Sequence, residues 1–292
     1  MSILFSLALA LAQTSPAPAA PAVHAEPSDA IAADWKAIPA DELLVMRLAD
    51  GGSVVIRLAP QYAPRHVANI RALAQTHWWD GTSVYRVQDG YVTQWGDVSE
   101  KKPLPHGVAD DLPPEYEWRA TPLAATLSRG DPYARVAGFS ADGWPLASDG
   151  TAQWLPHCYA MVGVARDLAP STGSGAELYT VIGHAPRHLD RNIALVGRVI
   201  DGMEYLSSLP RGRGEMGFYT DAQHPTGIVS VRLASDMPAG ERPAYQYRAT
   251  DNARFAAYIS AKENRQPPFF TVPADGADIC NVPAPVRKTP GK

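Results

Sequence analysis

The chain has 292 residues, of which 46% are hydrophobic and 19% are charged. This composition is typical of a globular protein and excludes a chain that is disordered throughout. The formal net charge of -4 argues against nucleic acid as a main partner, because binding to phosphates requires a basic surface.

The N-terminus predicts export. Residues 3–12 (ILFSLALALA) form an uninterrupted apolar run, which has the length of a signal-peptide core and is too short to span a bilayer. The Pro/Ala-rich residues 13–25 are expected to form an extended spacer. We therefore expect residues 1–25 to be a signal peptide with a spacer, and the mature protein to be periplasmic or secreted without stable membrane insertion. The alternative is a buried or disordered N-terminus.

The body of the chain begins with strong local signals. Residues 43–48 and 53–58 are two β-rich runs, and the turn-forming sequence between them predicts a hairpin. Residues 64–75 predict a helix, because a proline suits its first turn and apolar residues recur at helical spacing. Residues 83–87 and 91–95 predict two further strands.

The middle of the chain is irregular. Residues 99–157 are rich in Pro, Gly and Asp and predict a long, partly ordered insertion with short strands, for example around residues 123–127. After it, the pattern predicts a short helix over residues 201–209 with Asp201 near its cap, and strands at residues 158–162, 177–182, 193–200 and 228–233. These elements together favour an antiparallel barrel or sandwich capped by helices.

The sequence changes character after residue 235. Residues 251–262 predict a helix that Asp251 would cap, and the Pro-rich remainder is expected to be extended or disordered. We therefore expect a main domain over residues 26–235 and a C-terminal extension over residues 236–292.

The two cysteines, Cys158 and Cys280, fit two interpretations. They could form one disulfide in an oxidising compartment or remain two buried free thiols, and the residues alone leave both open. A thiol nucleophile at His157-Cys158 is disfavoured, because the sequence shows no supporting triad.

No metal site is expected. His184 and His188 have the i,i+4 spacing of metal ligands, but Pro186 between them disfavours an intact helix and no third ligand is evident. An acidic cluster in the insertion predicts a solvated loop, with calcium binding as the alternative; it consists of Asp110, Asp111, Glu115 and Glu117.

Five segments, in order along the chain, carry a resemblance to the cyclophilins. They are residues 55–69 (VIRL followed by APRHVAN, against the family's AP…V.NF helix start), 85–87 (YRV, against F-H-R-V), 91–97 (YVTQWGD, against G-F-M-x-Q-G-G-D), 175–179 (GAELY, against G-S-Q-F-F) and 189–203 (LD followed by VGRVIDGM, against W-L-D-G-K-H-x-V-F-G-x-V-x-x-G-M). The chain is therefore similar to a divergent bacterial cyclophilin-type peptidyl-prolyl cis-trans isomerase with a central insertion and a C-terminal extension. The resemblance implies a mainly β fold: an eight-stranded antiparallel barrel closed by two helices, with residues 99–157 as an inserted irregular segment.

The resemblance also implies an activity and its residues. The family isomerises X-Pro bonds, whose barrier to rotation is about 18–20 kcal/mol, and the reaction requires no nucleophile, metal or cofactor. An arginine suits this task because it stays charged and presents directional N–H donors. By resemblance Arg86 is the catalytic residue, and Gln94 would orient it and bind the substrate backbone. The expected substrate-binding residues are Tyr91, Val92, Glu177, Tyr179, His188 and Leu189.

Four positions depart from the family pattern. Glu177 stands where the family has glutamine and could pair with Arg86, and the other three are His188 for tryptophan, Ile193 for histidine and Trp95 for glycine. The changes at Glu177, His188 and Ile193 favour an alternative function, a chaperone module that binds proline-containing segments with weak or no isomerase activity. In both cases the expected partners are proline-containing segments of exported proteins, and the chain is expected to be a monomer.

Overall fold

A computed structural model of the chain describes residues 30–99 and 101–291. The predicted signal peptide and spacer, residues 1–25, lie outside these described residues. Within the described part, no helix has the length and apolar character needed to cross a membrane.

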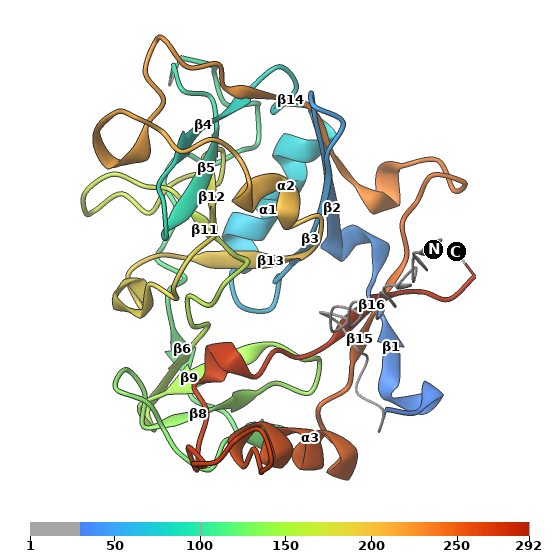
Figure 1. Ribbon diagram of the computed structural model, residues 1–292. Coiled ribbons are helices and arrows are strands. Elements are labelled where there is room, and N and C mark those ends of the chain that lie inside the picture. Colours follow the sequence, from blue (N-terminus) through green and yellow to red (C-terminus); the bar gives the residue numbers. More distant parts are fainter. Residues whose placement is uncertain (1–29, 100, 292) are drawn as a thin grey trace, which may run out of the picture.

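The upper part of the molecule in Figure 1 is a closed barrel of eight antiparallel strands, as the resemblance implied. Around the barrel the strands follow the order β11-β12-β5-β4-β14-β2-β3-β13. Their bounds are Leu43–Leu48 (β2), Ser53–Leu58 (β3), Ser83–Val87 (β4), Val92–Gly96 (β5), Met161–Val164 (β11), Leu178–Val181 (β12), Leu195–Asp201 (β13) and Thr226–Leu233 (β14).

Two helices accompany the barrel, α1 (Pro64–Gln75) and the short α2 (Glu204–Ser207). The helix α1 begins with Pro64 in its first turn and buries Val67, Ile70 and Leu73 against the barrel interior. Because side chains alternate between the two faces of a strand, one apolar set from β2 and β3 packs in the same core as α1. Burial of this apolar surface holds the barrel together. The predicted hairpin and helix are confirmed with these bounds.

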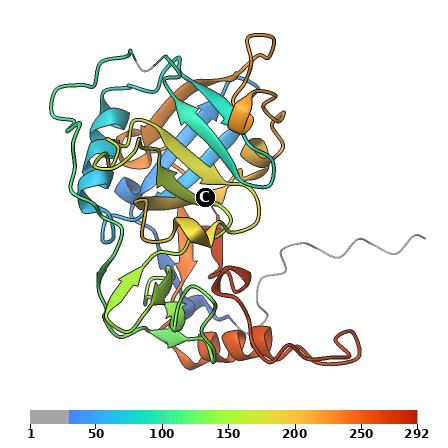
Figure 2. The same ribbon diagram turned by 90° about the vertical axis from the view of Figure 1, so that its left-hand side faces the viewer.

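The insertion forms a sheet of its own. Its five strands lie in the order β6-β10-β9-β8-β7, with bounds Trp118–Arg119 (β6), Ala125–Thr126 (β7), Val136–Phe139 (β8), Pro145–Ser148 (β9) and Ala152–Trp154 (β10). The helix α3 (Ala253–Glu263) of the C-terminal extension packs on this sheet, below the barrel (Figure 2). Phe139 meets Phe255 edge to face at 5.2 Å between ring centroids, and Cys158 and Cys280 are joined by a disulfide. Insertion and extension therefore share one hydrophobic core.

A third, smaller sheet joins segments from the two ends of the described chain. It has the order β1-β15-β16, with bounds Trp35–Ala37 (β1), Tyr245–Arg248 (β15) and Val286–Lys288 (β16). The remaining helical segments are single 3-10 turns: Ala32–Asp34 (η1), Ala40–Glu42 (η2), Arg187–Leu189 (η3), Glu215–Gly217 (η4), Ala234–Asp236 (η5) and Ile279–Asn281 (η6).

Arg57 of β3 connects all three parts. Its side chain is 2% exposed and donates hydrogen bonds of 2.8 Å to the carbonyl and to the carboxylate of Asp142 in the insertion. Its guanidinium also lies over the rings of Trp144 in the insertion and Tyr247 in β15, at 4.9 and 4.6 Å from the centroids. Arg57 also pairs with Glu42, at 3.5 Å from Nε to Oε2. Its hydrogen bonds to Asp142 and its contact with Trp144 therefore fix the insertion relative to the barrel.

Several predicted boundaries were wrong. The strand predicted at 158–162 begins at Met161, because the positive φ of Ala160 (70°) interrupts extended backbone. The helix predicted over 201–209 is only Glu204–Ser207, and Asp201 stays at the end of β13, where it accepts a hydrogen bond of 2.6 Å from the Tyr245 hydroxyl.

The C-terminal extension also differs from expectation. Asn252, rather than Asp251, caps α3: its side chain accepts the backbone N–H of Phe255 at 3.0 Å. The remainder, expected to be extended or disordered, includes η6 and β16 and is fixed by the disulfide at Cys280.

Candidate active site

A β-bulge in β4 creates the centre of the candidate site. Val84 and Val87 both face the barrel core, although strict alternation would place them on opposite faces. The register against β5 shifts between Val84 and Arg86, and the extra residue, Tyr85, absorbs the difference. The bulge therefore places Tyr85 and Arg86 together on the outer face of the barrel.

The Arg86 side chain is half-buried and held by three hydrogen bonds. Its Nη1 atom donates to Oε1 of Gln94 at 2.9 Å, its Nη2 atom to Oε1 of Gln88 at 2.5 Å, and its Nε atom to the carbonyl of Met216 at 2.8 Å. Burial lowers the pKa of the guanidinium from its ordinary value, while the neighbouring Tyr91 opposes that shift. An arginine remains cationic under these conditions, so the site carries a fixed positive charge.

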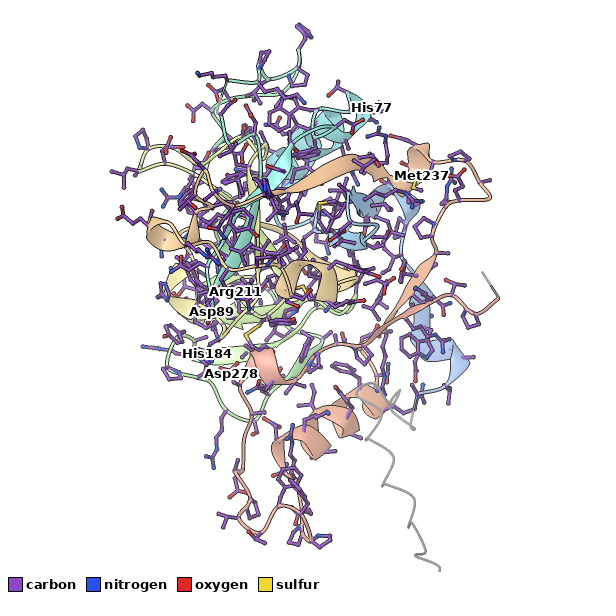
Figure 3. The ribbon with its side chains drawn as sticks, turned by 45° about the horizontal axis from the view of Figure 1, so that its top comes forward. His77, Asp89, His184, Arg211, Met237 and Asp278 are labelled. Atoms are coloured by element: carbon purple, nitrogen blue, oxygen red, sulfur yellow. A yellow bond between two sulfur atoms is a disulfide. The ribbon has the colours of Figure 1, made fainter. Side chains whose placement is uncertain are left out.

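The loop that precedes β14 covers Arg86 from one side. Phe218 lies 5.3 Å from the guanidinium, and Met216 supplies the carbonyl described above. This loop is tied to the turn between β4 and β5 by an ion pair in which Arg211 Nε donates to Asp89 Oδ1 at 2.7 Å (Figure 3). An exposed pair of this kind contributes little stability, but it sets the position of the loop relative to Arg86.

Gln94 links Arg86 to Glu177 through Tyr85. The Gln94 amide donates to the Tyr85 hydroxyl at 2.8 Å, and this hydroxyl donates to Glu177 Oε2 at 2.6 Å. The other Glu177 oxygen accepts the backbone N–H of Asp97 at 2.6 Å. Glycine at position 96 makes room for the carboxylate, because a Cβ atom there would lie 2.1 Å from it. The family departure at Glu177 thus acts on Arg86 through a chain of hydrogen bonds.

An apolar wall stands beside the arginine. Tyr179 of β12 lies opposite Gln94 of β5, and Gln94 lies opposite Arg86 of β4, so the three residues follow one another across neighbouring strands. Side chains directly opposite each other share one face of a sheet. Val92, Tyr179 and Val181 form a buried cluster with the partly buried Tyr91, Ala165 and Ile193.

The remaining predicted site residues lie in η3. His188 is exposed and stacks on Tyr91, with centroids 6.1 Å apart and an interplanar angle of 9°. Leu189 is half-buried and is not a member of the apolar cluster around Tyr179, as far as the described residues show.

Sequence reasoning missed Tyr85, Phe218 and the Met216 carbonyl. The aromatic Tyr85 within the arginine motif was a usable signal, whereas the loop of Phe218 carries none.

The candidate metal ligands are placed elsewhere. Among the described residues, no group of three or more His, Cys, Asp or Glu side chains is arranged to hold a metal ion. His184 is exposed in the loop before η3. Within the acidic cluster, the prediction of a solvated loop is wrong for Glu115. Its carboxylate accepts hydrogen bonds from the backbone N–H groups of Arg65 and His66 at the start of α1, at 2.9 and 3.0 Å.

The fold and this outer-face site define a cyclophilin-like barrel protein. A family model for the cyclophilin-type peptidyl-prolyl cis-trans isomerases matches residues 43–232, and the chain therefore belongs to this family.

Relatives with assigned names support the same family. The chain is 25% identical over 198 residues to a probable peptidyl-prolyl cis-trans isomerase of Brucella suis, covering 67% of this chain and 84% of that protein. It is 26% identical over 166 residues to peptidyl-prolyl cis-trans isomerase B of Bacillus subtilis, covering 56% of this chain and 88% of the relative. Among solved structures, the fold matches cyclophilin AquaCyp293 from Hirschia baltica with a TM-score of 0.70 at 24% identity, over 91% of this chain and 98% of that one. The structural likeness thus extends beyond the residues that the family model matches.

Proposed function

We propose that the chain isomerises X-Pro bonds of exported polypeptides, with Arg86 as its catalytic residue. The observation that carries the proposal is the row Arg86–Gln94–Tyr179, which sets a fixed cation beside an apolar wall on three neighbouring strands. The apolar wall contacts the proline ring of the substrate, and the cation stabilises the X-Pro amide as its C–N bond twists.

The chemistry follows from the amide bond. Rotation about an X-Pro bond is slow, with a barrier of about 18–20 kcal/mol, because the nitrogen lone pair is delocalised into the carbonyl. A donor that points at the nitrogen as the bond twists holds the lone pair there and lowers this barrier. The described contacts engage three of Arg86's N–H groups, and a guanidinium has about five, so donors remain for a substrate.

The neighbours of Arg86 have supporting roles. Gln94 accepts from the guanidinium through its oxygen and donates to Tyr85 through its nitrogen, and this fixes the orientation of its amide. Tyr91, Val92 and Tyr179 would contact the proline ring. Binding of this kind stabilises substrate and transition state alike, whereas the contact from Arg86 strengthens as the bond twists.

Export and assistance to folding belong to the same proposal. The apolar run at residues 3–12 favours export, and the disulfide between Cys158 and Cys280 suits an oxidising compartment such as the periplasm. The proposed clients are proline-containing segments of exported proteins, and the proposed state is a monomer. Cell fractionation with thiol labelling tests the location: a reduced, cytoplasmic chain would contradict it.

The activity is tested by Arg86→Ala in a protease-coupled assay of a proline peptide. We expect a loss of roughly 100-fold in kcat/KM, comparable to the removal of one preorganised charge-stabilising donor. Arg47→Ala is the control, because Arg47 is an exposed strand arginine in β2. Unchanged turnover in a folded Arg86→Ala variant would remove the residue from its role.

A second candidate function is favoured by the departures at Glu177, His188 and Ile193. In it the barrel binds proline-containing segments as a chaperone and turns them over poorly. Suppression of client aggregation without acceleration of isomerisation would establish this function in place of the first.

A further inference from the structure

The hydroxyl of Tyr179 is hydrogen-bonded to a buried side chain of the insertion. Tyr179 is 5% exposed, and its hydroxyl lies 2.8 Å from Nε2 of His157, a residue that is 0% exposed. The two rings are nearly parallel, with an interplanar angle of 12° and centroids 6.3 Å apart. A tyrosine in the apolar wall can therefore present only its ring to a substrate.

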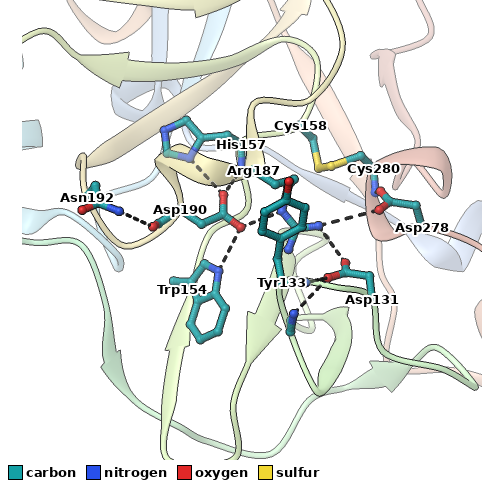
Figure 4. Close-up of polar contacts among 11 residues, drawn as sticks. Asp131, Tyr133, Trp154, His157, Cys158, Arg187, Asp190, Asn192, Asp278 and Cys280 are labelled. Carbon is teal, nitrogen blue, oxygen red and sulfur yellow. Dashed lines mark hydrogen bonds and ion pairs between the residues drawn. A yellow bond between two sulfur atoms is a disulfide. The ribbon is translucent and has the colours of Figure 1, made fainter.

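Asp190 holds His157 in place (Figure 4). The imidazole Nδ1 atom lies 3.1 Å from Asp190 Oδ1, and the same oxygen accepts the backbone N–H of His157 at 2.9 Å. The second oxygen accepts from Trp154 Nε1 at 3.1 Å and from Arg187 Nε at 2.6 Å. A carboxylate at Nδ1 places the proton there, which leaves Nε2 as the acceptor for the Tyr179 hydroxyl.

The protonation states agree with this assignment. Burial lowers the pKa of His157, against the opposing pull of Asp190, so the imidazole is neutral at neutral pH. Burial also raises the pKa of the Tyr179 hydroxyl well above its ordinary value, which keeps the hydroxyl protonated and able to donate. Burial alone would raise the pKa of Asp190, but the hydrogen bond from His157 and the charge of Arg187 outweigh it and lower the pKa.

The Tyr179 ring is also confined on its other side. Gly163 of β11 lies opposite Tyr179 in the barrel, and a Cβ atom at Gly163 would lie 2.4 Å from both Cζ and the hydroxyl oxygen of the ring. The ring therefore lies directly over the β11 backbone.

From these contacts we infer that His157, oriented by Asp190, is a positioning residue of the isomerase, which sets the Tyr179 ring as a wall for the substrate's proline. This inference rests on the proposed function and deepens it. It assigns a role to the insertion, because His157, which contacts Tyr179, and Trp154, which contacts Asp190, both belong to residues 99–157.

The support continues into the C-terminal extension. Arg187 donates to Asp131 of the insertion at 2.7 Å and lies 3.8 Å from Asp278 of the extension. Cys158, next to His157 in the chain, is bonded to Cys280. The barrel strand that carries Tyr179 is thus braced by both added segments.

The test is a double-mutant cycle between His157 and Tyr179. His157→Leu removes the anchor, His157→Gln keeps an amide able to meet the hydroxyl, and Tyr179→Phe removes the hydroxyl itself. We expect His157→Leu to lower kcat/KM by about fivefold to tenfold, the effect of one buried hydrogen bond, mostly through a higher KM. We expect Gln at this position to recover most of the loss. His184→Leu is the matched control, because His184 is an exposed histidine in the loop before η3.

The cycle separates positioning from simple destabilisation. If the inference holds, His157→Leu costs less than about twofold once Tyr179→Phe is present, because the two changes remove the same interaction. An equal cost in both backgrounds would overturn the inference. If His157→Leu fails to fold, Tyr179→Phe decides, because it removes the same hydrogen bond: a loss like that expected for His157→Leu supports the inference, and unchanged kcat/KM overturns it.

The outcome remains distinct from failure of the proposed function. If the wild-type chain has no isomerase activity, the proposed function fails, and the cycle is measured as the dissociation constant of a peptide containing Ala-Pro. Weaker peptide binding by His157→Leu, rescued by His157→Gln, would then support the positioning role, and unchanged binding would overturn it.

Discussion

Arg86 donates a hydrogen bond of 2.9 Å to Gln94 across the β4–β5 pair, and Gln94 in turn donates to Tyr85 at 2.8 Å. The guanidinium is thereby oriented by the Gln94 amide, which is itself oriented by the Tyr85 hydroxyl. Orientation of this kind lowers the cost of reaching the transition state, because the donor does not have to be ordered during the reaction.

The first prediction concerns this amide. Gln94→Leu should lower kcat for a proline peptide about tenfold, because the arginine loses an oriented acceptor while its charge remains. Stopped-flow measurement of isomerisation, with Gln266→Leu in the exposed part of the extension as the control, checks it. Full activity in Gln94→Leu would show that Gln88 and Met216 suffice to hold Arg86.

The second prediction concerns the space beneath Tyr179. Gly163→Ala should raise KM severalfold and lower stability by about 1–3 kcal/mol, because the added methyl group meets the ring at 2.4 Å and forces it toward the substrate. Gly240→Ala is the control, because a Cβ atom at Gly240 meets nothing within 4 Å. Peptide titration and thermal unfolding measure the two effects. An unaltered KM would show that the Tyr179 ring can shift without weakening substrate binding.

The third prediction concerns the disulfide. Cys280→Ser should lower the free energy of unfolding by about 2–5 kcal/mol, because a link between residues 122 apart restricts the unfolded chain. Isomerase activity should persist below the melting temperature, since Asp190, itself held by Trp154, still supports His157. Reductant should destabilise the wild type and leave Cys280→Ser unchanged; equal effects on both would point to another target.

The fourth prediction concerns acid stability. The hydrogen bond from Arg254 lowers the pKa of Asp34 from 3.8 to about 2. A lowered carboxyl pKa stabilises the folded state above the unfolded value, and this stabilisation is lost as pH falls through the folded value. The stability difference between wild type and Asp34→Asn should therefore be constant above about pH 5 and shrink between about pH 4 and 2. Arg254→Gln should weaken this dependence without removing it, because the Ile31 N–H and the charge of Arg248 also lower the pKa of Asp34. A wild-type difference that stays constant down to pH 2 would contradict the assignment.

Local signals account for the parts of the fold that could be predicted. The hairpin of β2 and β3 and the helix α1 each have a turn or cap beside a clear apolar period, so neighbours in sequence determine them. The insertion strands, such as β8, are short and find their partners through tertiary pairing, so no window of sequence marks them. The same limit explains α2: the pairing of Asp201 with Val55 of β3 keeps the start of the predicted helix in β13.

The site was predictable only where residues lie in recognisable motifs. Arg86, Gln94 and Tyr179 lie in such segments, and the structure brings them into one row. The contact between His157 and Tyr179 joins residues 22 positions apart on different elements, and in the sequence His157 appears only as the neighbour of a cysteine. Contacts of that kind are determined by the tertiary fold and produce no periodic pattern in the sequence.

The small sheet of β1, β15 and β16 has a consequence for how this protein is made. Trp35 in β1 lies opposite Arg248 in β15, and β15 is itself bordered by β16. A ribosome, or a translocation channel that admits the chain from its N-terminus, releases β1 long before its partner exists. Until residue 245 has emerged, β1 lacks β15, the strand that it pairs with in the finished sheet. The small sheet can therefore form only after nearly all of the chain has been synthesised.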